Sequence, residues 1–184
     1  MKLVGWIRYG DKAACGGTVI GSDPTTNSNG RPLASVGAPM ACPKNCVIVE
    51  GHPFVTFDGK MTPHHGHRTS YGCPLISSLN DVHGWGAGDE PIPSSFYQDA
   101  EGGWQPKYGP EHFTEESPDE QVRAVDAKTG EPIPDLAYHI KAPDGTTYNG
   151  YTDAEGLCER VTTYQPEELT VWFGEEAEKK RQGA

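Results

Sequence analysis

The chain has 184 residues, of which 23 are glycine and 16 are proline, and only 35% are apolar. This composition disfavours long regular helices and predicts an all-β protein of short strands joined by turns. The net charge of −11 leaves no basic face for nucleic-acid binding, and no apolar run approaches the roughly 20 residues of a membrane span.

Residues 1–8 are interrupted too early by charged and small side chains to form the apolar region of a signal peptide, so we expect synthesis in the cytoplasm. Charge divides the chain, because the first 85 residues hold seven Lys/Arg and five Asp/Glu, whereas the remaining 99 hold eight and 21. Two differently built domains are therefore predicted at 1–85 and 118–176. A linker at 86–117 separates them.

The first domain contains an internal repeat. Landmarks between residues 19 and 37 recur between residues 48 and 66 at a constant offset of 29 residues. Each copy has a turn dipeptide at its centre, Asn29-Gly30 in one and Asp58-Gly59 in the other, and such dipeptides favour type I′ hairpins because both residues need positive φ. A third, truncated copy begins at Gly72. Units that cannot bury an apolar face alone stack around a shared axis, so three similar β units are predicted.

Four of the five cysteines lie between Cys15 and Cys73. In a reducing compartment this clustering indicates metal ligation before disulfides, although pairing stays open if the protein leaves the cell. Cys46 and Cys73 occupy the same position of their units, and Cys15 precedes the first strand of its unit, so three thiols should converge near one axis. With His65 as a fourth ligand, they would form a closed tetrahedral Zn2+ site.

Cys42 competes for a place in this site, because its spacing from Cys46 also suits chelation of one metal. Five candidate ligands therefore compete for four positions: Cys15, Cys42, Cys46, His65 and Cys73. His64 and His67 flank His65, but neighbours on an extended segment point to opposite faces, so only one of the three is expected to face inward. The alternative is a cluster of buried cysteines without a metal.

Four segments of the first domain, residues 10–19, 42–46, 65–66 and 72–84, resemble the PAAR-repeat family. In that family three β units form a small cone with a zinc ion near its apex. The base of the cone docks on the blunt end of the valine-glycine-repeat (VgrG) trimer in type VI secretion systems. The resemblance, which covers residues 1 to about 85, implies a tip that sharpens this spike, with one copy per trimer and transient contact with the target membrane during firing.

Residues 86–117 are rich in glycine, proline and acidic residues and show no sustained periodicity, which is typical of a linker or an irregular arm. Aromatic side chains nevertheless argue against a purely solvated tether: Phe96, Tyr97, Trp104, Tyr108 and Phe113. We expect them to pack back on one of the two domains. The alternative is that they grip a partner.

Apolar and polar side chains alternate in short segments between residues 121 and 174, which predicts a compact antiparallel sandwich. Residues 125–134 and 150–156 resemble the small transthyretin-like modules appended to carboxypeptidases and to secretion spikes. In such modules Asp153 and Gly156 shape a turn. The resemblance implies a domain that recruits an effector protein or an adaptor, and its acidity suits a basic patch on that partner.

The remaining features of this half are simpler. Residues 177–184 read as a solvated charged tail, and Cys158 reads as a core or strand residue. The leading hypothesis is therefore a structural spike tip and cargo adaptor with no enzymatic activity. It would be cytoplasmic in the producing bacterium and then secreted or delivered into a target cell.

The same residues give less support to two rival functions. A zinc-dependent enzyme needs an open coordination position, and three thiolates with His65 leave none. A toxin in the C-terminal half, delivered on the spike, would need catalytic groups, yet His139 is the one conventional base there.

Overall fold

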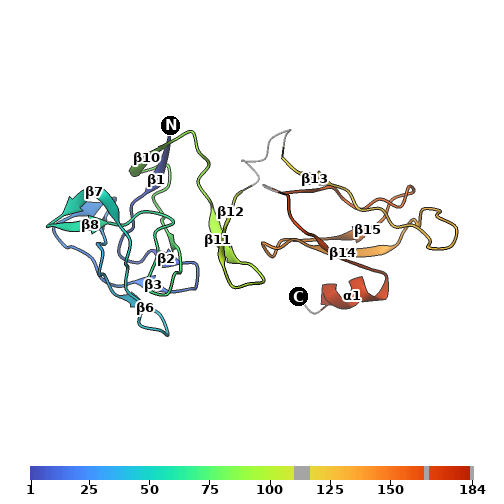
Figure 1. The fold of residues 1–184 in the computed structure, drawn as a ribbon, viewed down its shortest axis with the longest axis horizontal. Coiled ribbons are helices and arrows are strands. Elements are labelled where there is room, and N and C mark those ends of the chain that lie inside the picture. The colour runs from blue at the N-terminus through green and yellow to red at the C-terminus, as the bar shows by residue number, and fades with distance from the viewer. Residues whose placement is uncertain (110–116, 164–165, 183–184) are drawn as a thin grey trace. The chain divides into compact units, whose positions relative to one another are not determined.

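The computed structural model describes residues 1–109, 117–163 and 166–182. They form two units, one of Met1–Gln98 with Gly102–Tyr108 and the other of Asp99–Glu101 with Gly109–Ala184. Figure 1 shows that both are built of short strands, with one helix in the described residues, so the all-β prediction is confirmed. That helix has eight residues, and none of the described helical structure is long and apolar enough to cross a membrane.

The first unit is a set of small antiparallel sheets. Its strands are β1 (Lys2–Gly5), β2 (Lys12–Ala13), β3 (Thr18–Val19), β4 (Asn27–Ser28), β5 (Arg31–Pro32), β6 (Met40–Ala41), β7 (His52–Phe57), β8 (Lys60–Thr62), β9 (Leu75–Ile76), β10 (Gly84–Gly88), β11 (Ser95–Gln98) and β12 (Trp104–Lys107). The largest sheet has the order β6-β3-β2-β9, and the other strands pair as β1-β10, β4-β5, β7-β8 and β11-β12.

The two predicted hairpin turns are present. Asn29 and Gly30 join β4 to β5 with φ values of 47° and 79°, and Asp58 and Gly59 join β7 to β8 with values of 48° and 71°. Both central residues of each turn are therefore left-handed, as a type I′ turn requires. Asparagine, aspartate and glycine tolerate this conformation at the least steric cost.

The four-stranded sheet brings three separate cysteine-bearing segments to one end. Cys15 lies in the turn between β2 and β3, Cys42 directly follows β6, and Cys73 lies two residues before β9. Strands β3 and β6 pair antiparallel, with Thr18 opposite Ala41. Because neighbouring antiparallel strands run in opposite directions, the end of one lies beside the beginning of the next.

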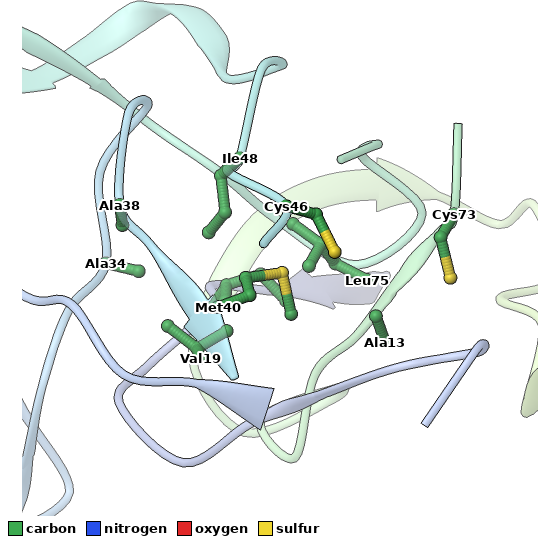
Figure 2. Packing of buried hydrophobic residues seen from close by; sticks show 10 residues of the cluster. Ala13, Val19, Ala34, Ala38, Met40, Cys46, Ile48, Cys73 and Leu75 are labelled. Carbon is green, nitrogen blue, oxygen red and sulfur yellow. The ribbon is translucent and has the colours of Figure 1, made fainter. Parts of the chain in front are cut away.

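An apolar core includes one residue from each strand of this sheet. It consists of ten buried residues: Ile7, Ala13, Val19, Ala34, Ala38, Met40, Cys46, Ile48, Cys73 and Leu75. Figure 2 shows Met40, Cys46 and Leu75 close together within the cluster and Cys73 at its edge. Two of the candidate ligands are thus anchored in the core, at 3% and 2% exposure for Cys46 and Cys73.

Part of the segment predicted as a linker belongs to the first unit. Residues 84–88 form β10 and pair with β1, and β11 and β12 form an antiparallel hairpin. Trp104 packs against the apolar core, and the Phe96 ring lies 5.2 Å from the His65 ring. These two aromatic side chains therefore pack back on a domain, as expected, whereas Phe113 lies outside the described residues.

The second unit contains the remaining strands and the helix. They are β13 (Asp119–Glu120), β14 (Ala137–Lys141), β15 (Thr147–Tyr151), β16 (Val161–Thr162), β17 (Thr170–Phe173) and α1 (Glu175–Gln182). One sheet has the order β15-β14-β17 and a second pairs β13 with β16. Buried Tyr138, Ile140, Cys158 and Val161 form the core of this unit, so the prediction that Cys158 is a core residue is confirmed.

The turn at residues 153–156 has the predicted structural role. The Asp153 carboxylate accepts hydrogen bonds from the backbone N–H groups of Glu155 (3.0 Å) and Leu157 (2.8 Å). Gly156 has a φ of 73°, and a Cβ there would lie close to the backbone of Ala124. Both residues thus shape the backbone.

The C-terminal segment differs from its prediction as a solvated tail, because residues 175–182 form α1. Glutamates occupy its first turn and basic residues its last turn, which complements the helix dipole. Ala177 is fully buried, the Lys180 ammonium lies 5.0 Å from the centre of the Trp172 ring, and the Arg181 guanidinium lies 5.3 Å from that of Tyr151. The helix is therefore docked on the sheet.

Replacing Ala177 by lysine should undock α1. The new side chain has no room at a fully buried position, and undocking also removes two cation–π contacts worth about 0.5–1 kcal/mol each. We expect the second unit to lose about 1–2 kcal/mol of its free energy of unfolding, measured by hydrogen exchange of β14 and β17. Glu176→Lys, at an exposed neighbouring position, is the matched control and should change stability by less than about 0.5 kcal/mol. Equal effects of the two substitutions would contradict the docking.

Candidate metal centre

Four of the five predicted ligands line one hollow in the first unit. The hollow has a volume of about 480 Å3, and Cys15, Cys42, Cys46 and Cys73 all contribute to its wall. Trp104 of β12 also lines it. The predicted convergence of the cysteines is therefore present, and Cys42 and Cys46 both take part in it.

The sulfurs are joined in two disulfide bonds. Cys15 pairs with Cys73 across 58 residues, with Cα atoms 6.1 Å apart, and Cys42 pairs with Cys46, with Cα atoms 6.3 Å apart. In the part of the chain that the structure describes, no three His, Cys, Asp or Glu side chains are arranged to hold a metal. A disulfide sulfur carries no negative charge, and zinc binds the thiolate. The donor set thus fits a metal only when these cysteines are reduced.

Backbone N–H groups point at two of the sulfurs. The Cys15 N–H donates to the Cys73 sulfur at 2.9 Å, and the Cys46 N–H donates to the Cys42 sulfur at 3.1 Å. Hydrogen bonds to the charged form of a group favour that form, so both donors would stabilise thiolates. Lys44 also lines the hollow, and its positive charge acts in the same direction.

His65 lies elsewhere in the first unit. Its Nδ1 accepts a hydrogen bond from the Ser77 N–H at 3.1 Å and lies 3.2 Å from the Asn80 amide nitrogen. It lines a smaller hollow of about 210 Å3 together with Phe96, and no cysteine lines that hollow. The structure therefore does not bring His65 to the four cysteines, although His65 is the buried member of its histidine group, as predicted.

The neighbouring histidines form a stack. The rings of His64 and His67 lie 3.6 Å apart, and the ring of His52 lies 6.0 Å from that of His64. Burial, followed by repulsion from His64, lowers the pKa of His65 to about 4, and burial with the charges of His64 and His52 lowers the pKa of His67 to about 4. The rings of His65 and His67 are therefore neutral in the folded protein at neutral pH.

The first unit should lose stability as the pH falls from 6.5 towards 4. The folded chain keeps His65 neutral down to about pH 4, whereas the unfolded chain takes up a proton near pH 6.5, so protons favour unfolding in this window. At pH 5 we expect the free energy of unfolding to be about 2 kcal/mol lower than at pH 7 because of His65. His67 is partly exposed and should contribute less. Denaturant titrations at pH 7 and pH 5 measure this. His65→Gln should make the free energy of unfolding depend less on pH. An unchanged dependence in this variant would contradict the role of His65.

A buried ionic network lies near β2 and was not predicted. The Asp11 carboxylate accepts hydrogen bonds from the Arg31 guanidinium (3.0 Å), the Ser78 hydroxyl (2.6 Å) and the Arg8 backbone N–H (2.9 Å). Arg8 and Asp11 are only 6% and 3% exposed. The one sequence signal was an aspartate three residues after an arginine, ahead of the first repeat copy, and this pattern alone does not indicate burial.

Comparison with known proteins places the first unit in a family. A family model for the PAAR motif matches residues 9–77, a range that contains all four cysteines of the hollow. No curated protein and no solved structure matches the chain.

Residues 9–77 thus carry a PAAR motif within a fold of short antiparallel β units, and this supports the assignment of the chain as a PAAR-repeat protein. The motif supports a general role at the tip of the type VI secretion spike and association with a VgrG spike.

Proposed function

We propose that this chain caps one VgrG trimer as a single copy and sharpens the spike for membrane puncture. The match of residues 9–77 to the PAAR motif carries the proposal. The three similar but non-identical units predicted from the sequence suit one copy on a threefold partner better than three copies. Native mass spectrometry of the chain mixed with a VgrG trimer tests this. One chain per three spike subunits is expected, and a three-to-three complex or no complex would contradict it.

We further propose that the reduced chain holds one structural zinc ion between Cys15, Cys42, Cys46 and Cys73. The proposal is supported by their common hollow and by the N–H groups that face two of the sulfurs. Four thiolates form a closed tetrahedral set without an open position, which suits a structural role and leaves no place for a substrate or an activated water. Zinc would tie together three chain segments that are far apart in the sequence.

Metal analysis of protein purified in reducing buffer without a chelating tag tests the zinc proposal. One zinc per chain is expected. Cys42→Ala should abolish this binding and His65→Ala should not, because His65 lies at a separate hollow. A sub-stoichiometric metal content in the unaltered chain would contradict the proposal, and loss of zinc from His65→Ala alone would restore the sequence-based ligand set.

For the second unit we propose that it recruits a cargo protein by its β15 edge. β15 is an end strand of its sheet and carries no charged residue, and unpaired backbone groups at such an edge can accept an added strand. Asp144, Glu159 and Glu167 lie near enough to Tyr148 to raise the pKa of its phenol, after burial, which is the main cause. This negative potential suits an extended cargo segment rich in Lys and Arg.

Charge reversal at this edge tests the cargo proposal. We expect Glu159→Lys combined with Glu167→Lys to leave capping of the spike intact and to abolish secretion of the cargo, as measured by comparing secreted proteins by mass spectrometry. Glu175→Lys combined with Glu176→Lys, on α1, introduces the same charge elsewhere and is the matched control. Unchanged secretion in the first variant would contradict the proposal, and growth arrest on expression of the second unit in susceptible bacteria would favour a toxin instead.

A further inference from the structure

The two disulfides share one arrangement of exposed and buried sulfurs. Cys15 is exposed and its partner Cys73 is buried, and Cys42 is partly exposed while its partner Cys46 is buried. In thiol–disulfide exchange an accessible thiolate attacks the oxidant and a second thiol nearby resolves the mixed disulfide. Each pair therefore combines an accessible attacking sulfur with a shielded resolving sulfur.

We propose that these four cysteines are an oxidation site at which formation of the Cys15–Cys73 and Cys42–Cys46 disulfides displaces the metal. The inference rests on the zinc-binding function proposed above. Metal ligation and disulfide formation use the same four sulfurs and exclude each other, because each needs the electron pairs that the other consumes. The chain would therefore exist in a reduced, metal-bound state and an oxidised, metal-free state.

The chemical step balances with a small-molecule disulfide as the oxidant. The Cys15 thiolate attacks one sulfur of the oxidant, breaks its S–S bond and releases one thiolate. The Cys73 thiolate then attacks Cys15 in the mixed disulfide and releases the second thiolate. The pair has lost two electrons and the oxidant has gained two. Cys42 and Cys46 repeat the sequence, the four sulfurs release the divalent cation, and the four oxidant thiolates take up protons from water.

The reduced, metal-bound state and the oxidised state would both tie chain segments together at the same end of the sheet. The Cys15–Cys73 bond lies beside the backbone hydrogen bond from the Ala14 N–H to the Pro74 carbonyl (2.8 Å), where β2 meets β9. The Cys42–Cys46 bond closes the turn after β6, in which Asn45 has a φ of 50°. The Cys15–Cys73 bond thus keeps β2 and β9 tied at this end after the metal leaves, whereas the Cys42–Cys46 bond joins residues four positions apart and closes only its own turn.

A site that stays tied in both redox states would suit a chain that is made in one compartment and works in another. Disulfides form and persist in oxidising compartments and are rare in the reducing cytoplasm. A spike tip made in the cytoplasm and driven across a bacterial envelope passes from one condition to the other. A site with two closed states would keep its structure in both.

The test titrates purified, zinc-loaded full-length chain with glutathione disulfide and follows three readouts. We expect release of one zinc per chain, detected with a zinc-sensitive dye, and a fall in the number of alkylatable cysteines under denaturing conditions from five to one, which is Cys158. Cleavage before the aspartates at positions 11, 23, 58 and 81 then separates Cys15 and Cys73 from the peptide that carries both Cys42 and Cys46. The oxidised chain should yield 11–22 linked to 58–80, and 23–57 with an internal bond.

Two variants sharpen the result. Cys158→Ala removes a thiol outside the hollow and should leave zinc release and the peptide pattern unchanged. Cys73→Ala should form the Cys42–Cys46 bond alone and leave two alkylatable cysteines, Cys15 and Cys158. Retention of zinc by the fully oxidised chain, a link from 23–57 to either other peptide, or failure to oxidise would overturn the proposal. A reduced chain that binds no zinc but forms the mapped disulfides would overturn the exchange and the zinc function, and it would leave the spike-capping function standing.

Discussion

Cys73→Ala is expected to leave the first unit largely unfolded in reducing buffer at 25 °C. Structural zinc sites contribute on the order of 10 kcal/mol of apparent binding free energy, which is folding free energy when the unfolded chain lacks the site. Whole domains are stable by only about 5–15 kcal/mol. Cys73 is 2% exposed and lies next to β9, so its loss removes a ligand, leaves a small cavity and takes away the acceptor of the Cys15 N–H.

Circular dichroism and hydrogen exchange of β2, β3 and β9, with zinc content measured on the same sample, test this prediction. Cys158→Ala is the matched control, because Cys158 is equally buried but lies in the core of the second unit. It should cost about 1–2 kcal/mol in that unit and leave zinc content unchanged. In oxidising buffer, Cys73→Ala should cost about 4 kcal/mol, the loop-closure contribution of a bond across 58 residues. Normal stability of reduced Cys73→Ala would contradict the metal clip.

Asp11→Ala should destabilise the first unit by about 3–5 kcal/mol, because it removes the ion-pair partner of Arg31 and leaves the buried charge of Arg8 without a compensating negative charge. The Asp11 carboxylate contacts the Arg31 guanidinium and the Arg8 backbone N–H, and burial followed by the charge of Arg31 lowers the pKa of Arg8. The Arg8 guanidinium donates to the carbonyls of Ser28 and Asn29 at 3.0 and 3.1 Å. It therefore holds the first hairpin turn against the segment that precedes β2, and repulsion from Arg31 would disturb that contact.

Urea titration measures this loss. Asp11→Asn keeps the shape and one acceptor oxygen but removes the charge, so it should fall between Asp11→Ala and the unaltered chain. Asp89→Ala removes a fully exposed carboxylate and should change stability by less than about 0.5 kcal/mol. If Asp11→Ala and Asp89→Ala have similar effects, the network does not stabilise the unit.

Features of this fold that depend on local chemistry could be predicted from the sequence. The Asn29-Gly30 and Asp58-Gly59 hairpins follow from the positive φ that their turn type requires. The gathering of the cysteines followed from their common position in repeated units. The position of His65 could not be predicted, because its repeat counterpart is the apolar Val36. The repeat pattern therefore does not indicate which residues contact the histidine.

Long-range pairings and weakly amphipathic elements were missed for physical reasons. The β1-β10 pair joins residues about 80 positions apart and depends on Gly84, where a Cβ would clash with the Val4 carbonyl. The helix α1 has one buried side chain, Ala177, so it shows almost no apolar periodicity. Its charge pattern, acidic at the start and basic at the end, was the available signal.

X-ray absorption spectroscopy at the zinc edge of the reduced, full-length chain tests the central claim most directly. Four sulfur ligands at about 2.3 Å are expected if Cys15, Cys42, Cys46 and Cys73 hold the ion. A shell that contains nitrogen at about 2.0–2.1 Å, or a chain without bound zinc, would contradict the four-cysteine centre.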